Sequence, residues 1–125
     1  MFSHIMIGTN DLDRAKTFYD KVLGTLGVPP ARVDGHRIFY MTPTGVFSVS
    51  KPIDGEPATA PNGGTIGFAC SSSEQADAWH AAGVDAGGTT CEDPPGVREG
   101  SSGKLYLAYL RDPDGNKLCG LYRMG

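Results

Sequence analysis

Residues 4–24, HIMIGTNDLDRAKTFYDKVLG, decide the fold class because a strand pattern runs directly into a helix pattern. Residues 2–8 alternate around His4 with side chains that favour strands, which predicts a β-strand. Asn10 or Asp11 can cap the helix that follows, and Asp13 adds negative charge to its first turn. Apolar residues then recur at steps of three and four, a stripe suited to packing on a sheet: Leu12, Ala15, Phe18, Tyr19, Val22, Leu23 and Leu26.

The first helix is followed by short strands and then by an irregular segment. Strand patterns are expected at residues 30–34, 36–42 and 45–51. Residues 52–64 contain three prolines and three glycines, which rules out a regular element there. This segment is therefore interpreted as a linker.

The same order of elements follows the linker. Residues 65–70 predict a strand, and a serine among residues 71–73 can cap a helix that ends near Ala82. Further strands are expected at 88–92, 104–110 and 116–122, the last two joined by the turn DPDG. Alternation in the strand 104–110 places Leu105, Leu107 and Tyr109 on one face and Tyr106 on the other.

The composition fits one domain of this kind. The 125 residues include 18 glycines and 9 prolines, too many for a helix bundle but suited to short strands and tight turns. A hydrophobic content of 39% argues against disorder. We expect a single α+β domain over residues 1–125, with modules 1–51 and 65–125 of order βαβββ around the linker 52–64.

The same numbers exclude several classes of protein. No apolar stretch approaches the length of a membrane span, so no membrane partner is expected. A net charge of −3 without a basic cluster disfavours nucleic acid. Three cysteines without a CxxC motif, and a start without a basic leader before an apolar run, predict reduced thiols and a cytoplasmic location.

Three stretches carry a family resemblance in this order: HIMIGTNDLDRAKTFYDKVLG (4–24), GGTIGFACSSSEQADAWHAAG (63–83) and YLAYLRDPDGNKLCGLY (106–122). Together they resemble the vicinal oxygen chelate superfamily, which includes glyoxalase I, bleomycin and fosfomycin resistance proteins and extradiol dioxygenases. The resemblance implies two βαβββ modules that form a curved, half-open barrel around a groove. It also implies a small-molecule ligand in that groove and a homodimer.

In metal-dependent members the groove holds a divalent cation, and the resemblance indicates where the ligands would lie. His4 occupies the first ligand position, whereas Thr65 stands where many relatives carry His and Cys119 where Glu is usual. A divalent centre needs three or more good donors, and this set offers only His4 and Cys119. We therefore expect no resident divalent metal, with His4 as the one candidate metal ligand; a soft metal on His4 and Cys119 is the alternative.

The candidate catalytic residues are His4 and Tyr109. Tyr109 matches the tyrosine before the closing turn of fosfomycin-type relatives, so the resemblance implies a phenol that orients substrate. A core aromatic is the alternative for Tyr109, and a hydrogen-bonded groove histidine is the alternative for His4. The candidate substrate-binding residues are Tyr40, Ser48, Thr65, Arg98 and Cys119.

Arg98 lies in the Gly- and Pro-rich segment 93–103, which is expected to form a loop able to fold over the groove as a lid. Its guanidinium could bind a carboxylate or a phosphate there.

Three functions are consistent with these residues. The first is a glyoxalase-like lyase or isomerase, in which His4 acts as ligand or base and Tyr109 orients the substrate. The second is a dimer that sequesters a drug or metabolite without chemistry, as bleomycin resistance proteins do. A dioxygenase is least supported, because the sequence offers no matching set of two histidines and one carboxylate for iron.

Overall fold

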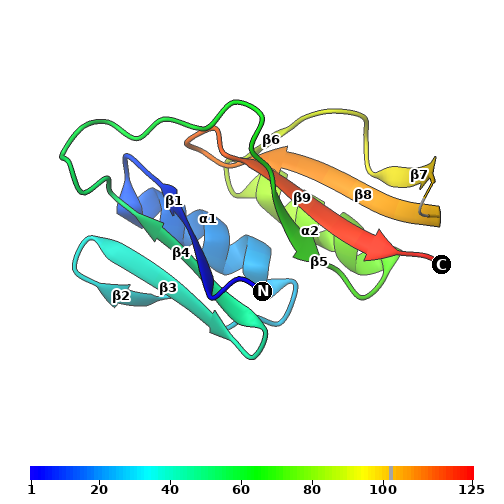
Figure 1. Ribbon diagram of the computed structural model, residues 1–125, viewed down its shortest axis with the longest axis horizontal. Coiled ribbons are helices and arrows are strands. Elements are labelled where there is room, and N and C mark those ends of the chain that lie inside the picture. The colour runs from blue at the N-terminus through cyan, green and yellow to red at the C-terminus, as the bar shows by residue number, and fades with distance from the viewer. Residues whose placement is uncertain (102) are drawn as a thin grey trace.

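The computed structural model describes residues 1–101 and 103–125, and Figure 1 shows two similar modules side by side. The first module comprises β1 (His4–Gly8), α1 (Leu12–Gly24), β2 (Arg32–Asp34), β3 (Arg37–Thr42) and β4 (Gly45–Ser50). The second comprises β5 (Ile66–Ala69), α2 (Ser73–Asp85), β6 (Thr89–Thr90), β7 (Gly96–Gly100), β8 (Gly103–Arg111) and β9 (Lys117–Arg123).

Each module has its own mixed sheet. The first sheet has the order β1-β4-β3-β2, and the second has the order β5-β9-β8-β6 with β7 also paired to β8. β1 runs parallel to β4, as β5 does to β9, and the remaining pairs are antiparallel. The expected α+β fold of two modules is confirmed, but the second module has one strand more than the expected order βαβββ, because β7 is inserted between β6 and β8. The two sheets do not close into a barrel within the described residues.

The helix caps explain where both helices begin. Asp11, rather than Asn10, caps α1, and its carboxylate accepts a hydrogen bond from the Arg14 N–H at 3.0 Å. Ser72 caps α2 in the same way through the Gln75 N–H. α2 continues past the expected end near Ala82 to Asp85, and Gly83 within its last turn packs against the buried Leu110. A Cβ on Gly83 would overlap a methyl carbon of Leu110, so this glycine serves close packing rather than helix termination.

The expected lid over residues 93–103 is wrong. β7 occupies the middle of this segment and pairs antiparallel with β8, from Gly96 opposite Leu107 to Gly100 opposite Gly103. Gly103 has a φ of 107°, a conformation that L side chains rarely adopt and that a tight return into β8 uses here. Ser102, within the predicted loop, lies outside the described residues.

Each sheet has a helix face, covered by α1 and α2, and an open face that points away from them. Figure 1 shows the two helices together behind the sheets. One core runs through both modules on the helix side, because Tyr19, Phe47, Phe68 and Trp79 form a chain of ring contacts with centroids 5.0–6.3 Å apart. Cross-strand partners point to the same side of a sheet, so the register assigns the other strand residues to one face or the other.

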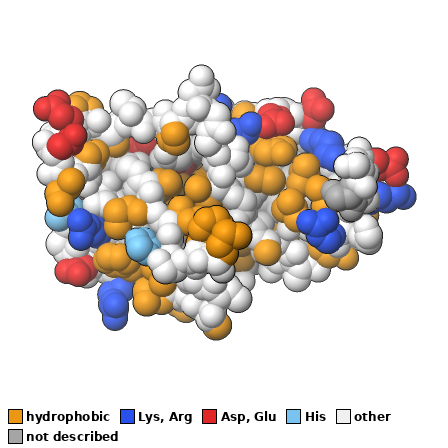
Figure 2. All heavy atoms as spheres, viewed as in Figure 1, with side chains coloured by type: hydrophobic (Ala, Val, Ile, Leu, Met, Phe, Trp, Pro, Cys, Tyr) orange, Lys and Arg blue, Asp and Glu red, His pale blue; other side chains and the backbone are white. Residues whose placement is uncertain are grey.

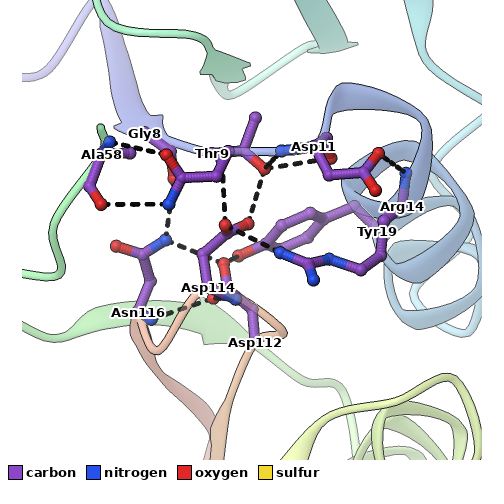
Figure 3. Close-up of polar contacts among 10 residues, drawn as sticks. Gly8, Thr9, Asp11, Arg14, Tyr19, Ala58, Asp112, Asp114 and Asn116 are labelled. Atoms are coloured by element: carbon purple, nitrogen blue, oxygen red, sulfur yellow. Dashed lines mark hydrogen bonds and ion pairs between the residues drawn. The ribbon is translucent and has the colours of Figure 1, made fainter. Parts of the chain in front are cut away.

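A polar cluster also holds the modules together (Figure 3). The turn after β8 carries Asp114, whose carboxylate accepts hydrogen bonds from the Thr9 hydroxyl at 2.5 Å and the Asn10 N–H at 2.9 Å. Arg14 on α1 adds an ion pair to the same carboxylate at 3.0 Å. Because Thr9, Asn10 and Arg14 all belong to the start of the first module, Asp114 links the two ends of the chain.

Asp112 and Asn116 complete this cluster from the same turn. Asp112 is buried and accepts hydrogen bonds from the Tyr19 hydroxyl, from the Asp114 N–H and from both nitrogens of Asn116. Asn116 also donates to the Gly8 carbonyl at 3.1 Å. These partners occupy the oxygens of Asp112, so we interpret the DPDGN turn as a structural link between the modules rather than as a binding site.

Candidate functional site

A tyrosine and a cysteine face each other on the open face of the second sheet. Tyr109 on β8 is the cross-strand partner of Cys119 on β9, and Cys119 in turn pairs with Gly67 on β5. Tyr106 points the other way, since its hydroxyl donates to Asp77 of α2. The expected placement of these two tyrosines on opposite faces is therefore confirmed.

Both members of this pair are held in their neutral forms at physiological pH. Burial raises the pKa of the Cys119 thiol, and the Glu92 charge adds to this against the opposing effects of Tyr109 and Lys117. Burial also raises the pKa of Tyr109, with Cys119 and Glu92 acting in the same direction. Tyr109 can thus donate a hydrogen bond to a ligand oxygen, whereas Cys119 is a poor nucleophile because little thiolate is present.

Glu92 is a charged member of this site that the sequence did not indicate. Its carboxylate forms an ion pair with Lys117, and the Lys117 ammonium lies 5.1 Å from the centroid of the Tyr109 ring. Glu92 also has a φ of 55°, and it is the one non-glycine residue with positive φ in the part of the chain that the structure describes. No sequence pattern marks this position, because Glu92 lies between strands and reaches Lys117 only through the fold.

The open face of the first sheet carries His4. This residue is exposed on β1, and its Nδ1 lies 2.8 Å from the Ser3 hydroxyl. Ser48 shares the open face through its pairing with Met6, but it is fully buried and its hydroxyl donates to the Ile5 carbonyl at 3.2 Å. Among the residues expected to line the groove, the first sheet therefore presents His4 and not Ser48.

A cavity of about 450 Å³ lies between the two modules. Its wall is mostly apolar, with a polar rim that includes His4, Thr42 and Thr44. On the other side β5 lines it through Ile66, Gly67, Phe68 and Ala69, so His4 and the strand next to Cys119 border one space. The remaining lining residues are Phe2, Ser3, Ile5, Leu23, Leu26, Val28, Tyr40, Gly45, Val46 and Phe47.

The placement of Tyr40 corrects the expectation that it shares the open groove with Ser48. Tyr40 pairs with Phe47 on the helix face, and its hydroxyl donates to the Asp20 carboxylate at 2.8 Å. Burial, followed by the contact with Asp20, raises the pKa of this phenol far above its ordinary value. Tyr40 reaches the inter-module cavity only as part of its inner wall.

Thr65 and Arg98 lie near the second sheet in different settings. Thr65 is exposed immediately before β5. Arg98 lies on the open face opposite Leu105, and its guanidinium donates to the carbonyls of Asp93 at 3.2 Å and Pro94 at 2.9 Å. Arg98 is thus fixed on the sheet rather than carried by a mobile lid.

The residues present do not fit a divalent metal site of the expected kind. Within residues 1–101 and 103–125, no three His, Cys, Asp or Glu side chains come together in a way that could hold an ion. His4 lies on the first sheet and Cys119 on the second, and the raised pKa of Cys119 disfavours the thiolate that a metal needs. No helix in these ranges is both long and apolar enough to span a membrane.

Comparison with known families agrees with this fold. The model of the Glyoxalase/Bleomycin resistance protein/Dioxygenase superfamily matches residues 1–119, and the chain belongs to this superfamily. A glyoxalase/bleomycin resistance protein from Albidiferax ferrireducens T118 is 61% identical, with a TM-score of 0.97 over 98% of this chain and 99% of the other. No curated protein matches the sequence.

More distant structures share the fold alone. A glyoxalase-related enzyme from Fulvimarina pelagi is 19% identical, with a TM-score of 0.74 over 98% of this chain and 88% of the other. A lactoylglutathione lyase from Agrobacterium tumefaciens is 20% identical, with a TM-score of 0.67 over 98% and 92% of the two chains. At such identities the shared architecture does not transfer an activity.

Proposed function

We propose that this protein binds a small molecule in the inter-module cavity and on the adjoining open face. The observation that carries the proposal is the cavity of about 450 Å³, which has His4 at its rim and β5, the strand beside Cys119, along one wall. This volume lies in the range of small-molecule sites, and an apolar wall with a few polar groups is their usual construction.

The chemistry that fits these residues is a glyoxalase-like lyase or isomerase reaction without a resident divalent metal. His4 is exposed at the rim and would move a proton, while the neutral Tyr109 hydroxyl would orient a substrate oxygen. The alternative is a sequestering protein of the bleomycin-resistance type. The neutral Cys119 thiol supports this alternative, and so does the finding that no three metal-ligating side chains come together within residues 1–101 and 103–125, because sequestration needs neither a nucleophile nor a metal.

A homodimer in the cytoplasm completes the proposal. Met6 and Met41 are 42% and 52% exposed on the open face of the first sheet, and a second copy of the chain would cover them. The three cysteines Cys70, Cys91 and Cys119 are free, which suits a reducing compartment.

Binding in the cavity can be tested with 4-phenylbutan-1-ol, a neutral probe with an apolar body. Methyl NMR should show shifts at Leu23, Leu26 and Val28, which line the cavity. Leu26→Trp should fill the cavity and abolish these shifts, whereas Val84→Trp, on the exposed surface of α2, should leave them unchanged. Absence of shifts at the cavity methyls, or their survival in Leu26→Trp, would overturn the proposed site.

A second set of measurements separates the two functions. Formation of S-lactoylglutathione from methylglyoxal and glutathione that His4→Ala or Tyr109→Phe reduces would support the lyase. Absence of turnover would leave the sequestering protein. Elemental analysis and thermal shifts with Ni²⁺, Zn²⁺, Mn²⁺ and Fe²⁺ should show no stoichiometric metal; tight binding that His4→Ala abolishes would contradict a metal-free site.

A further inference from the structure

The open face of the second sheet has basic side chains at both ends. Arg98, Leu105 and Arg123 form one cross-strand row on β7, β8 and β9. Arg111 and Lys117 form another row six residues along β8. The view in Figure 2 shows basic side chains near the end of the molecule where Figure 1 places β7 and the C-terminus.

An apolar floor lies between these rows. Leu107 pairs with Leu121, and the Tyr109–Cys119 pair follows two residues further along the strands. From Leu105 to Tyr109 the floor is about 13 Å long, at roughly 3.3 Å per residue. All three leucines and Tyr109 are only half-buried, so a ligand can reach the floor.

The charges of the two rows are balanced differently. In the second row Lys117 is neutralised by its ion pair with Glu92, while Arg111 donates to the Gly115 carbonyl at 2.9 Å and keeps its charge. Arg98 donates only to carbonyl oxygens, which hold its guanidinium in place without cancelling its charge. Arg123 is exposed and forms no ion pair with any described residue.

Acidic side chains are absent from the strand positions of this face, within the ranges that the structure describes. Glu99, the acidic residue of β7, points to the opposite side and pairs with Lys104 at 3.7 Å. A protein with a net charge of −3 therefore presents two guanidinium groups without ion pairs side by side, Arg98 and Arg123 on either side of Leu105, whereas Arg111 lies alone at the other end of the face. Two strand spacings separate their backbones by about 10 Å, close enough for both side chains to reach one small anionic group.

We propose that this face takes an amphipathic organic anion. Its carboxylate, phosphate or sulfonate lies between Arg98 and Arg123, and its apolar body lies along Leu107 and Leu121 toward Tyr109. The proposal rests on the proposed small-molecule function and adds the class of ligand. Charge-assisted hydrogen bonds to the guanidinium groups select the anion, while the apolar floor contributes affinity without regard to charge.

Three probes with the same apolar body test this selection: 4-phenylbutyrate, 4-phenylbutan-1-ol and 4-phenylbutylamine. Methyl NMR titrations resolve the place of binding, since Leu105, Leu107 and Leu121 report on this face and Leu23, Leu26 and Val28 on the cavity. The acid should bind at the open-face methyls at least tenfold more tightly than the alcohol. The amine should bind more weakly than the alcohol. Added salt should lower the affinity for the acid and not that for the alcohol.

Substitutions then identify the groups that select the anion. Arg98→Gln and Arg123→Gln should each lower the affinity for 4-phenylbutyrate about three- to tenfold and leave the affinity for the alcohol unchanged. The matched control is Lys104→Gln, which removes a nearby positive charge that points to the helix side. Arg123→Lys should retain part of the affinity because its charge remains.

Equal binding of acid and alcohol at the open-face methyls would overturn the anion proposal and leave the small-molecule function standing. The anion proposal also fails if the acid shifts only the cavity methyls, or if Arg98→Gln and Arg123→Gln bind it as the wild type does. Failure of the acid to bind anywhere overturns it as well. The proposed function falls separately, when the neutral alcohol leaves the cavity methyls unshifted.

Discussion

The hydroxyl of Tyr19 on α1 lies 2.5 Å from a carboxylate oxygen of Asp112 in the turn between β8 and β9. Tyr19 is fully buried and Asp112 is 4% exposed, so this contact joins the two modules inside the protein. Burial raises the pKa of Tyr19 well above its ordinary value, and the charge of Asp112 raises it further. The phenol therefore remains a donor to the carboxylate at any physiological pH.

Tyr19→Phe should lower the free energy of unfolding by about 1–3 kcal/mol, because it leaves a buried carboxylate oxygen without this donor. Chemical denaturation with urea measures the change. Tyr106→Phe is the matched control, since it also removes a phenol hydrogen bond to an aspartate, at 2.7 Å to Asp77, but at an exposed position. The control should cost less than about 0.5 kcal/mol. Equal losses in the two variants would mean that Asp112 gains a replacement donor.

The sequence predicted the fold well because its signals are local and periodic. Two βαβββ units follow from alternating strands, capped helices and the linker 52–64. β7 was missed because residues 96–100 include two glycines and no apolar alternation, and pairing with the long β8 stabilises them instead. A strand formed through its partner leaves little trace in its own residues.

The site was less predictable because its residues meet only through register. The alternation of side chains along the strand predicted the face on which Tyr109 lies. Its position opposite Cys119 could be seen only from the pairing of β8 with β9. Glu92 gave no signal in the sequence. That Tyr40 and Ser48 lie on opposite faces of the first sheet could not be predicted either, because they lie on paired antiparallel strands whose register the sequence does not supply.

The hydrogen bonds of Asp20 lead to a prediction that the free energy of unfolding falls at acid pH. Burial alone would raise the pKa of this carboxyl, but hydrogen bonds from Lys16, the Ala31 N–H and Tyr40 together hold it below its ordinary value. A lowered pKa means that the folded state favours the charged carboxylate. Its contribution is therefore present above the unfolded pKa of about 3.9 and is lost as the pH falls through the folded value.

Asp20→Asn should therefore lower the free energy of unfolding by about 1 kcal/mol at pH 7, mainly through the lost ion pair with Lys16. The difference from the wild type should shrink as the pH falls from about 4 toward the lowered pKa of the folded state, because the unfolded chain takes up a proton at Asp20 before the folded carboxylate does. Urea unfolding at a series of pH values measures this. A pH-independent difference between Asp20→Asn and the wild type would contradict the assignment.

Gly120 predicts a packing effect in the core of the second module. A Cβ at this position would lie 2.9 Å from the fully buried Trp79 ring, with two more ring atoms within 3.3 Å. Gly120→Ala should therefore lower the unfolding free energy by about 1–3 kcal/mol, as overpacking does in close-packed cores. Gly67→Ala, on the neighbouring β5, has no heavy atom within 4 Å of the added carbon and should be neutral or slightly stabilising. Thermal unfolding of the two variants compares them, and equal melting temperatures would show that Trp79 moves freely.

The cysteines predict a graded reactivity toward a thiol reagent such as dithionitrobenzoate. Cys70 and Cys119 are 8% and 5% exposed, and burial raises the pKa of both, whereas Cys91 is more exposed. One thiol per chain should react rapidly at pH 7.5, and Cys91→Ser should remove that fast phase. The slow reaction of Cys70 and Cys119 should accelerate as the pH rises above 7.5, because a thiol with a raised pKa forms its reactive thiolate only at higher pH. Denaturant should expose all three thiols, and a fast phase that survives Cys91→Ser but disappears in Cys119→Ser would show that Cys119 is an accessible nucleophile after all.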